Sequence, residues 1–110
     1  MSDTYILKGH EPVRCDDLMK WAEWYETADR QVRDTMQDEV RVSTVFLGLD
    51  HGFGGRRELF ETMVFVNGSS VDCERYSTWD EAEAGHQRWV LQTFKPAPIL
   101  ALPTKGDADG

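Results

Sequence analysis

The sequence predicts a single α+β domain, in which a three- or four-stranded antiparallel sheet packs against two helices in the order (β)αβββα. A length of 110 residues suits one ordinary domain. Two segments place apolar residues at helical spacing. Three strand-like segments follow one another with no helix between them, which excludes a parallel sheet with crossover helices. We expect residues 1–95 to form the domain.

The N-terminal part predicts a short ribbon or edge strand followed by the first helix. The stretches "TYILK" and "PVRC" flank "GHE" and have strand-like composition. Asp16 or Asp17 can cap a helix that we expect over residues 17–35. Its apolar stripe consists of Leu18, Trp21, Ala22, Tyr25, Val32 and Met36. Trp24 lies toward the edge of this stripe, where it is either a boundary residue of the fold or an exposed contact for a partner protein.

The middle of the chain predicts the sheet. Residues 40–49 and 59–66 are rich in β-branched and aromatic side chains. The turn sequence "NGSS" follows, and residues 71–76 then alternate with a period of two. Three consecutive strands with short or medium links form an antiparallel meander.

The second helix has the clearest start in the sequence, because Thr78 and Glu81 form a capping box. The apolar face that follows consists of Trp79, Ala82, His86, Trp89, Val90 and Phe94. We expect Pro96 to end this helix. Residues 96–110 form a proline-rich tail that we expect to be partly disordered.

Composition disfavours several classes of function. Twenty acidic residues against 12 basic residues give a formal charge of −8, which repels nucleic-acid backbones and anionic membranes. The longest apolar runs are too short to span a bilayer, and the first residues lack the basic and apolar pattern of a secretory signal, so none is expected. Cys15 and Cys73 are too sparse for a disulfide framework, so we expect reduced thiols in a cytoplasm. The three histidines lack zinc-ligand spacing, so neither a metal nor a cofactor is expected.

The loop "GLDHGFGGRRE" over residues 48–58 is the main candidate for a functional site. His51 has the chemistry of a general base, with Asp50 or Glu61 as the carboxylate that orients it. Neighbouring residues of an extended chain point to opposite sides, which favours Glu61 over Asp50 for that role. The alternative is a polar hairpin tip with His51 in solvent or capping a backbone group.

The same loop is also a candidate anion site, in which Asp50 and His51 are further ligand-binding residues. Its glycines expose backbone N–H groups, and Arg56 or Arg57 can bind a phosphate or carboxylate in bidentate fashion. A strand follows the loop where known phosphate loops have a helix, and glycines in a hairpin also serve to permit positive φ. His86 is a further candidate, as a ligand or proton donor, or else as a buried histidine bonded to a backbone carbonyl.

Three blocks, "VSTVFLGLDHGFG", "LFETMVF" and "RYSTWDEAEAGH", resemble a set of small uncharacterised proteins encoded by bacteriophages and prophages. The resemblance spans about residues 5–92 and implies a phage or prophage origin, although "GGRRE" stands where a loop richer in glycine and proline is expected. It implies no specific activity. We therefore expect a non-enzymatic phage accessory protein in the host cytoplasm that binds a host protein or a small anionic ligand, with host takeover or counter-defence as one form of that role. The alternative is a small hydrolase or transferase that uses His51 and Glu61.

Overall fold

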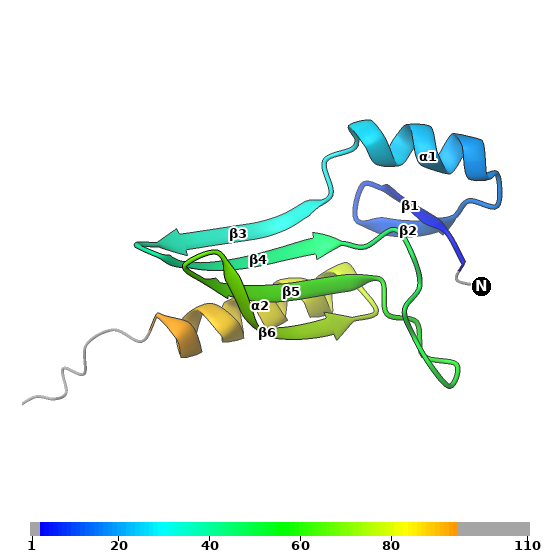
Figure 1. The fold of residues 1–110 in the computed structure, drawn as a ribbon. Coiled ribbons are helices and arrows are strands. Elements are labelled where there is room, and N and C mark those ends of the chain that lie inside the picture. Colours follow the sequence, from blue (N-terminus) through cyan, green and yellow to red (C-terminus); the bar gives the residue numbers. More distant parts are fainter. Residues whose placement is uncertain (1–2, 95–110) are drawn as a thin grey trace, which may run out of the picture.

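The fold is α+β with antiparallel sheets, as the sequence predicts (Figure 1). The computed structural model describes residues 3–94, so the expected tail over residues 96–110 and its Pro96 lie outside the described part. The elements are β1 (Tyr5–Lys8), β2 (Glu11–Arg14), α1 (Leu18–Thr27), β3 (Gln31–Gln37), β4 (Val40–Phe46), β5 (Phe60–Val66), β6 (Ser69–Tyr76) and α2 (Trp79–Thr93). Strands β3 to β6 form one four-stranded sheet in sequence order, while β1 and β2 form a separate hairpin. None of the helices in residues 3–94 is long and apolar enough to cross a membrane.

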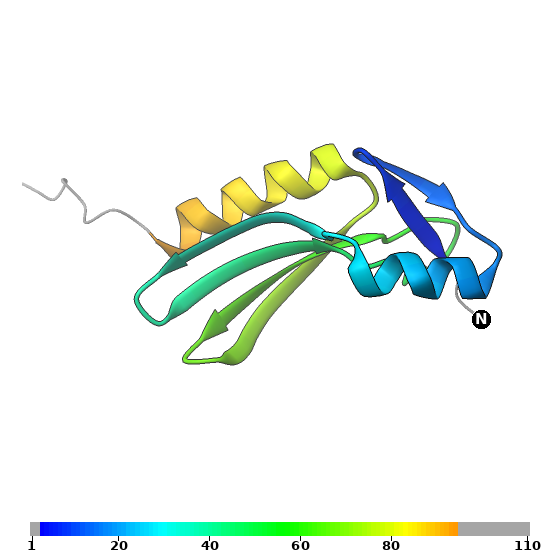
Figure 2. The same ribbon diagram turned by 90° about the horizontal axis from the view of Figure 1, so that it is seen from above.

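The two helices occupy different parts of the molecule. α2 lies along one face of the four-stranded sheet and contacts all four of its strands (Figure 2). α1 packs against β1, and together with the β1–β2 hairpin it lies near the end of the sheet where β4 ends and β5 begins. The hairpin and α1 therefore extend the domain at one end of the sheet.

The expected first helix over residues 17–35 is wrong in its second half. α1 begins after Asp17, whose carboxylate accepts the N–H groups of Met19 and Lys20, and it ends at Thr27. Residues 31–37, including Val32 and Met36, form β3 instead, paired with β4. A separation of four residues fits the helical period and is also a multiple of the strand period of two, so the spacing of Val32 and Met36 does not distinguish the two structures. Pairing with β4 decides the outcome.

The expected meander is confirmed, with β3 added as a fourth strand. β4 pairs with β5 from Val40 opposite Val66 to Phe46 opposite Phe60. The turn between β5 and β6 uses Asn67 and Gly68, with φ of 52° and 81°. Positive φ at both central residues matches the twist of a two-residue hairpin.

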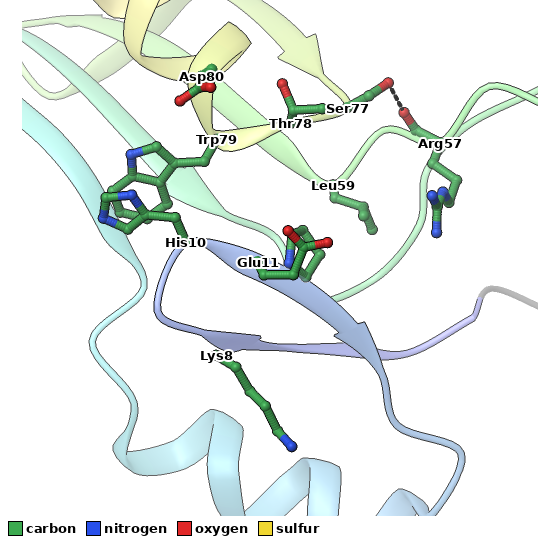
Figure 3. A pocket seen from close by; sticks show the side chains of 10 residues that line it. Lys8, His10, Glu11, Arg57, Leu59, Ser77, Thr78, Trp79 and Asp80 are labelled. Atoms are coloured by element: carbon green, nitrogen blue, oxygen red, sulfur yellow. Dashed lines mark hydrogen bonds between the residues drawn. The ribbon is translucent and has the colours of Figure 1, made fainter.

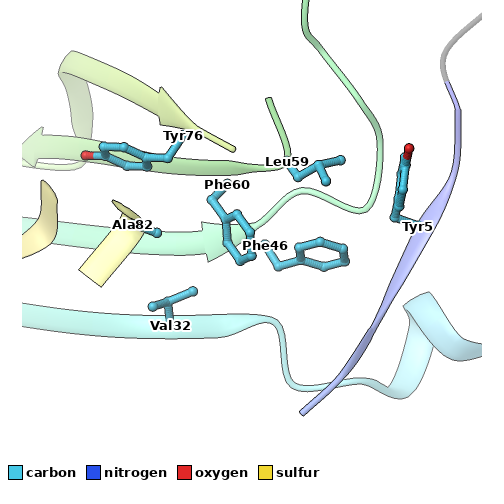
Figure 4. Close-up of a cluster of buried hydrophobic side chains, with 7 residues drawn as sticks. All are labelled: Tyr5, Val32, Phe46, Leu59, Phe60, Tyr76 and Ala82. Atoms are coloured by element: carbon cyan, nitrogen blue, oxygen red, sulfur yellow. The ribbon is translucent and has the colours of Figure 1, made fainter. Parts of the chain in front are cut away.

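The core lies between α2 and the sheet and continues to the N-terminal hairpin. Its buried side chains are Tyr5, Val32, Phe46, Leu59, Phe60, Tyr76 and Ala82 (Figure 4). The rings of Phe46 and Phe60 lie 5.2 Å apart, and Trp24 of α1 packs edge-on against Phe46 at 5.8 Å. Because Tyr5 belongs to this cluster, the hairpin is held against the end of the sheet next to Leu59.

The predicted capping box of α2 is present. Thr78 Oγ1 accepts the N–H of Glu81 at 3.1 Å, and the Glu81 carboxylate accepts the N–H of Ser77 at 3.0 Å. Asp80 and Glu81 also place negative charge in the first turn, where it is favourable to the helix dipole. The N-terminus of α2 therefore begins at a defined position beside the hairpin.

Candidate functional site

The loop between β4 and β5 projects from the body of the domain (Figure 1). Asp50 closes it from within, because its Oδ1 accepts the N–H groups of Gly52 at 2.8 Å and Glu58 at 3.0 Å. The N–H of His51 donates to the carbonyl of Glu58 at 3.1 Å, and the N–H of Arg56 donates to the carbonyl of Phe53 at 3.2 Å. Asp50, which the sequence suggests as a ligand-binding residue, thus serves here to hold the loop.

Glycine is required at the tip of this loop. A Cβ on Gly52 would lie 1.7 Å from the carbonyl oxygen of Arg56. Gly54 and Gly55 have φ of 62° and 85°, which other residues rarely adopt. The glycines therefore permit a backbone path that other residues could not adopt without strain or a clash.

Phe53 lies at that tip and is 93% exposed, which makes it the most exposed of the large apolar residues in the described chain. Burying a phenylalanine is worth about 1.5–3 kcal/mol, so a core would normally retain it. The sequence pattern pointed to the polar neighbours of Phe53 and gave no prediction for Phe53 itself. The available signal for an exposed contact residue was an aromatic side chain flanked by glycines within a loop.

Arg56 and Arg57 point to different surroundings. Arg56 lies 3.9 Å from a Glu58 carboxylate oxygen and 3.8 Å from one of Glu81. Arg57 donates to the hydroxyl of Tyr5 at 3.2 Å, and its guanidinium lies 5.6 Å from the centre of that ring. The two guanidinium groups therefore face different neighbours and do not converge on one point.

Arg57 lines a cavity of about 470 Å³ between the tip of the β1–β2 hairpin and the start of α2 (Figure 3). Pro12 and the buried Leu59 supply apolar surface. At one side His10 stacks on Trp79, with ring centroids 3.8 Å apart and planes 5° from parallel. The sequence did not indicate this cavity, because its walls come from three distant segments.

The candidate catalytic residues are not brought together. His51 is exposed on the loop. Glu61 forms an ion pair with Arg75 at 3.0 Å and, because its neighbour Thr62 points toward α2, Glu61 lies on the opposite face of the sheet. His86 lies on the α2 side and is 3% exposed. The three side chains thus occupy three separate places, and no acid–base pair forms among them.

His86 is bonded inside the domain through both ring nitrogens. Its Nε2 lies 2.9 Å from Thr35 Oγ1, and its Nδ1 lies 2.8 Å from Thr44 Oγ1. Burial lowers the pKa of His86 below its ordinary value, and the nearby positive charge of Arg33 lowers it further. The neutral imidazole therefore joins α2 to β3 and β4. The expected bond to a backbone carbonyl is replaced by two threonine hydroxyls.

The hydrogen bonds continue from Thr44 through the sheet to a carboxylate. Thr44 and Thr62 hydroxyls lie 2.5 Å apart, and the Tyr76 hydroxyl lies 3.0 Å from Thr62 and 3.1 Å from Glu74 Oε1. Burial raises the pKa of Tyr76. Burial also raises the pKa of Glu74, but hydrogen bonds from Arg88, Trp89 and Tyr76 outweigh it and leave that pKa lowered.

The Glu74 carboxylate determines which group is the donor and which is the acceptor in each hydrogen bond of this series. The Glu74 carboxylate can only accept, so Tyr76 donates to it, Thr62 donates to Tyr76 and Thr44 donates to Thr62. His86 must then donate from Nδ1 to Thr44 and accept from Thr35 at Nε2. Every member of the chain is satisfied, which indicates a structural role under α2.

The remaining candidate, Trp24, is half-buried against Phe46. This placement fits a boundary residue of the fold. Within residues 3–94, no three His, Cys, Asp or Glu side chains are grouped so that they could hold a metal ion.

Comparison with known proteins gives no indication of function. No family model matches the sequence, and neither the curated proteins nor the solved structures include a significant match.

Proposed function

We propose that the protein is a non-enzymatic binding protein that contacts a partner protein through the loop over residues 50–58. The observation that carries the proposal is Phe53, which is 93% exposed at the tip of a loop whose backbone is held by internal hydrogen bonds. The separation of His51, Glu61 and His86 supports a binding role over the hydrolase or transferase alternative.

A rigid loop with an exposed aromatic residue suits protein recognition. Aromatic side chains that enter a pocket on the partner supply much of the binding energy of many interfaces. Because the hydrogen bonds of Asp50 already hold part of the loop backbone, binding costs less conformational entropy. The expected partner surface is an apolar pocket that accepts one phenyl ring.

The charge of the protein disfavours other partners of this loop. A formal charge of −8 repels anionic bilayers and nucleic acids. A single phenylalanine also supplies little membrane affinity by itself. A protein pocket is therefore preferred over a lipid surface.

The resemblance to phage-encoded proteins makes a bacterial host protein the expected partner. Binding would then take place in the host cytoplasm, and host takeover or the counteraction of a defence protein is one form of it.

Photo-crosslinking tests the proposal. A photoreactive phenylalanine analogue at position 53 is compared with the same analogue at Val71, which is 59% exposed on β6. We expect position 53 alone to crosslink one discrete bacterial protein. That protein, once purified, should bind at least tenfold more weakly to Phe53→Ala and to Gly52→Ala, and equally well to Val71→Ala.

Gly52→Ala adds a control on loop shape, because it retains Phe53 but its Cβ forces the backbone at Arg56 to move. Equal crosslinking at positions 53 and 71, or unchanged binding by Phe53→Ala, would refute a role for the loop. Circular dichroism and the thermal midpoint verify that each variant remains folded.

A further inference from the structure

The cavity beside Arg57, at the C-terminal end of the loop, carries an inference separate from recognition by Phe53. It lies between the hairpin tip and the start of α2, and its volume of about 470 Å³ is in the range of small-molecule sites. Pro12 and Leu59 are the apolar aliphatic residues of its lining. The stacked rings of His10 and Trp79 form one wall, and Arg57 forms the opposite wall (Figure 3).

Arg57 differs from most arginines of this acidic protein. Six others lie between 2.8 and 3.9 Å from a carboxylate oxygen, namely Arg14, Arg33, Arg41, Arg56, Arg75 and Arg88. Among residues 3–94, Arg57 has no carboxylate partner within such a distance. One of its N–H groups donates to Tyr5, which positions the guanidinium and leaves further donors for a ligand.

Glu11 also has no ion-pair partner in the described chain, and neither do Lys8 and Asp80 at the edges of the cavity. Figure 3 shows its carboxylate beside Leu59, between the His10–Trp79 wall and Arg57. Arg57 and Glu11 do not form an ion pair with each other either. A positive and a negative group thus lie beside this apolar lining, each able to accept a charge of the opposite sign.

The other polar groups at the cavity are less suited to hold a ligand. The first turn of α2 is already capped by Thr78 and Glu81, so its N-terminus is not an open anion site. The Lys8 side chain extends away from the Trp79 wall toward α1 in Figure 3. Recognition of charge therefore falls to Arg57 and Glu11.

We infer that this cavity binds a small zwitterion of the amino-acid or short-peptide type, with its carboxylate on Arg57, its ammonium group on Glu11 and its apolar side chain over Leu59. A purely anionic ligand such as phosphate would be attracted by Arg57 but repelled by Glu11 and Asp80. An amino acid instead matches both signs and the apolar lining. Guanidinium and carboxylate are the usual partners of these two groups.

Isothermal titration calorimetry with defined probes tests the inference. The probes are L-leucine, L-phenylalanine and the dipeptide Leu-Leu. N-acetyl-leucine lacks the ammonium charge, leucine amide lacks the carboxylate, and inorganic phosphate carries only negative charge. We expect saturable binding of at least one zwitterionic probe, and at least tenfold weaker binding of the three comparison compounds. Preference for the free amino acids or for the dipeptide then identifies the source of the ligand.

Matched variants locate the site. Arg57→Gln and Glu11→Gln should each weaken binding at least tenfold, whereas Arg75→Gln and Glu26→Gln, at exposed positions outside the cavity, should change it less than twofold. Glu11→Gln keeps the test valid if loss of the Arg57–Tyr5 bond disturbs the hairpin. The inference is overturned if no zwitterionic probe binds saturably, if phosphate binds more tightly than the amino acids, or if both cavity variants bind like the wild type.

Discussion

Replacing Thr62 by valine tests the buried chain of hydrogen bonds between His86 and Glu74. Thr62 is fully buried in β5, with its hydroxyl 2.5 Å from Thr44 Oγ1 and 3.0 Å from the Tyr76 hydroxyl. Valine keeps the shape of threonine and its preference for strands, but it can neither accept from Thr44 nor donate to Tyr76. The substitution therefore removes two hydrogen bonds with little change in packing.

The expected cost follows from those two bonds. Each contributes about 0.5–1.5 kcal/mol net, and the hydroxyl hydrogen of Thr44 is left buried without a partner. The additional apolar methyl group offsets about 0.8 kcal/mol. We therefore expect Thr62→Val to lower the free energy of unfolding by about 1–2 kcal/mol, or roughly 4–15 °C in the thermal midpoint for a domain of this size.

Urea unfolding followed by circular dichroism measures this difference directly. Thr27→Val is a matched control, because Thr27 is exposed on α1 and its hydroxyl contacts a helical carbonyl only at 3.4 Å. That variant should change the free energy of unfolding by less than about 0.5 kcal/mol. An unchanged or higher stability of Thr62→Val would refute the reasoning, and so would an Nε2–H tautomer of His86 in nitrogen NMR spectra of the wild type.

Three further outcomes are expected. Burial lowers the pKa of His86, so below the ordinary histidine pKa near 6.5 the unfolded chain binds a proton that the folded protein does not. The free energy of unfolding should therefore fall between pH 7 and pH 5.5, and it should fall less in His86→Gln. Urea midpoints measured across this pH range test the difference. Thr78→Ala should cost roughly 1 kcal/mol by uncapping α2, and an unchanged denaturation midpoint would contradict this role. Reducing agents and chelators should leave the thermal midpoint unchanged, since Cys15 and Cys73 are free and no metal cluster occurs in residues 3–94. A drop of several degrees would instead show a stabilising disulfide or metal ion.

The sheet and α2 could be predicted from sequence because local and long-range preferences agree there. In β4 and β5, β-branched and aromatic residues favour strands, and the turn at Asn67 and Gly68 has the backbone preference that a tight hairpin needs. Thr78 and Glu81 mark the start of α2 by a bond pattern contained within four residues. Such features depend little on the rest of the chain.

β3 could not be recognised in the same way. Its turn to β4 is made by Asp38 with φ of 55°, and the sequence there, Asp followed by Glu, lacks the glycine that usually marks such hairpins. The residues of β3 are mostly polar, and Val32 is its one buried apolar residue. Only the presence of β4 as a pairing partner identifies this segment as a strand, and that information lies outside the segment.

Arg56 and Arg57 have different surroundings, and part of this difference could have been predicted from the sequence. Neighbours on an extended chain point to opposite sides, and this rule, which argued against Asp50 as a partner of His51, also separates adjacent arginines. Arg56 accordingly faces the acidic residues Glu58 and Glu81, while Arg57 faces Tyr5 and the cavity. The rule predicts that only one of the pair can reach a given ligand. Which one does so depends on where the β1–β2 hairpin lies, and that position follows from the packing of Tyr5 into the core.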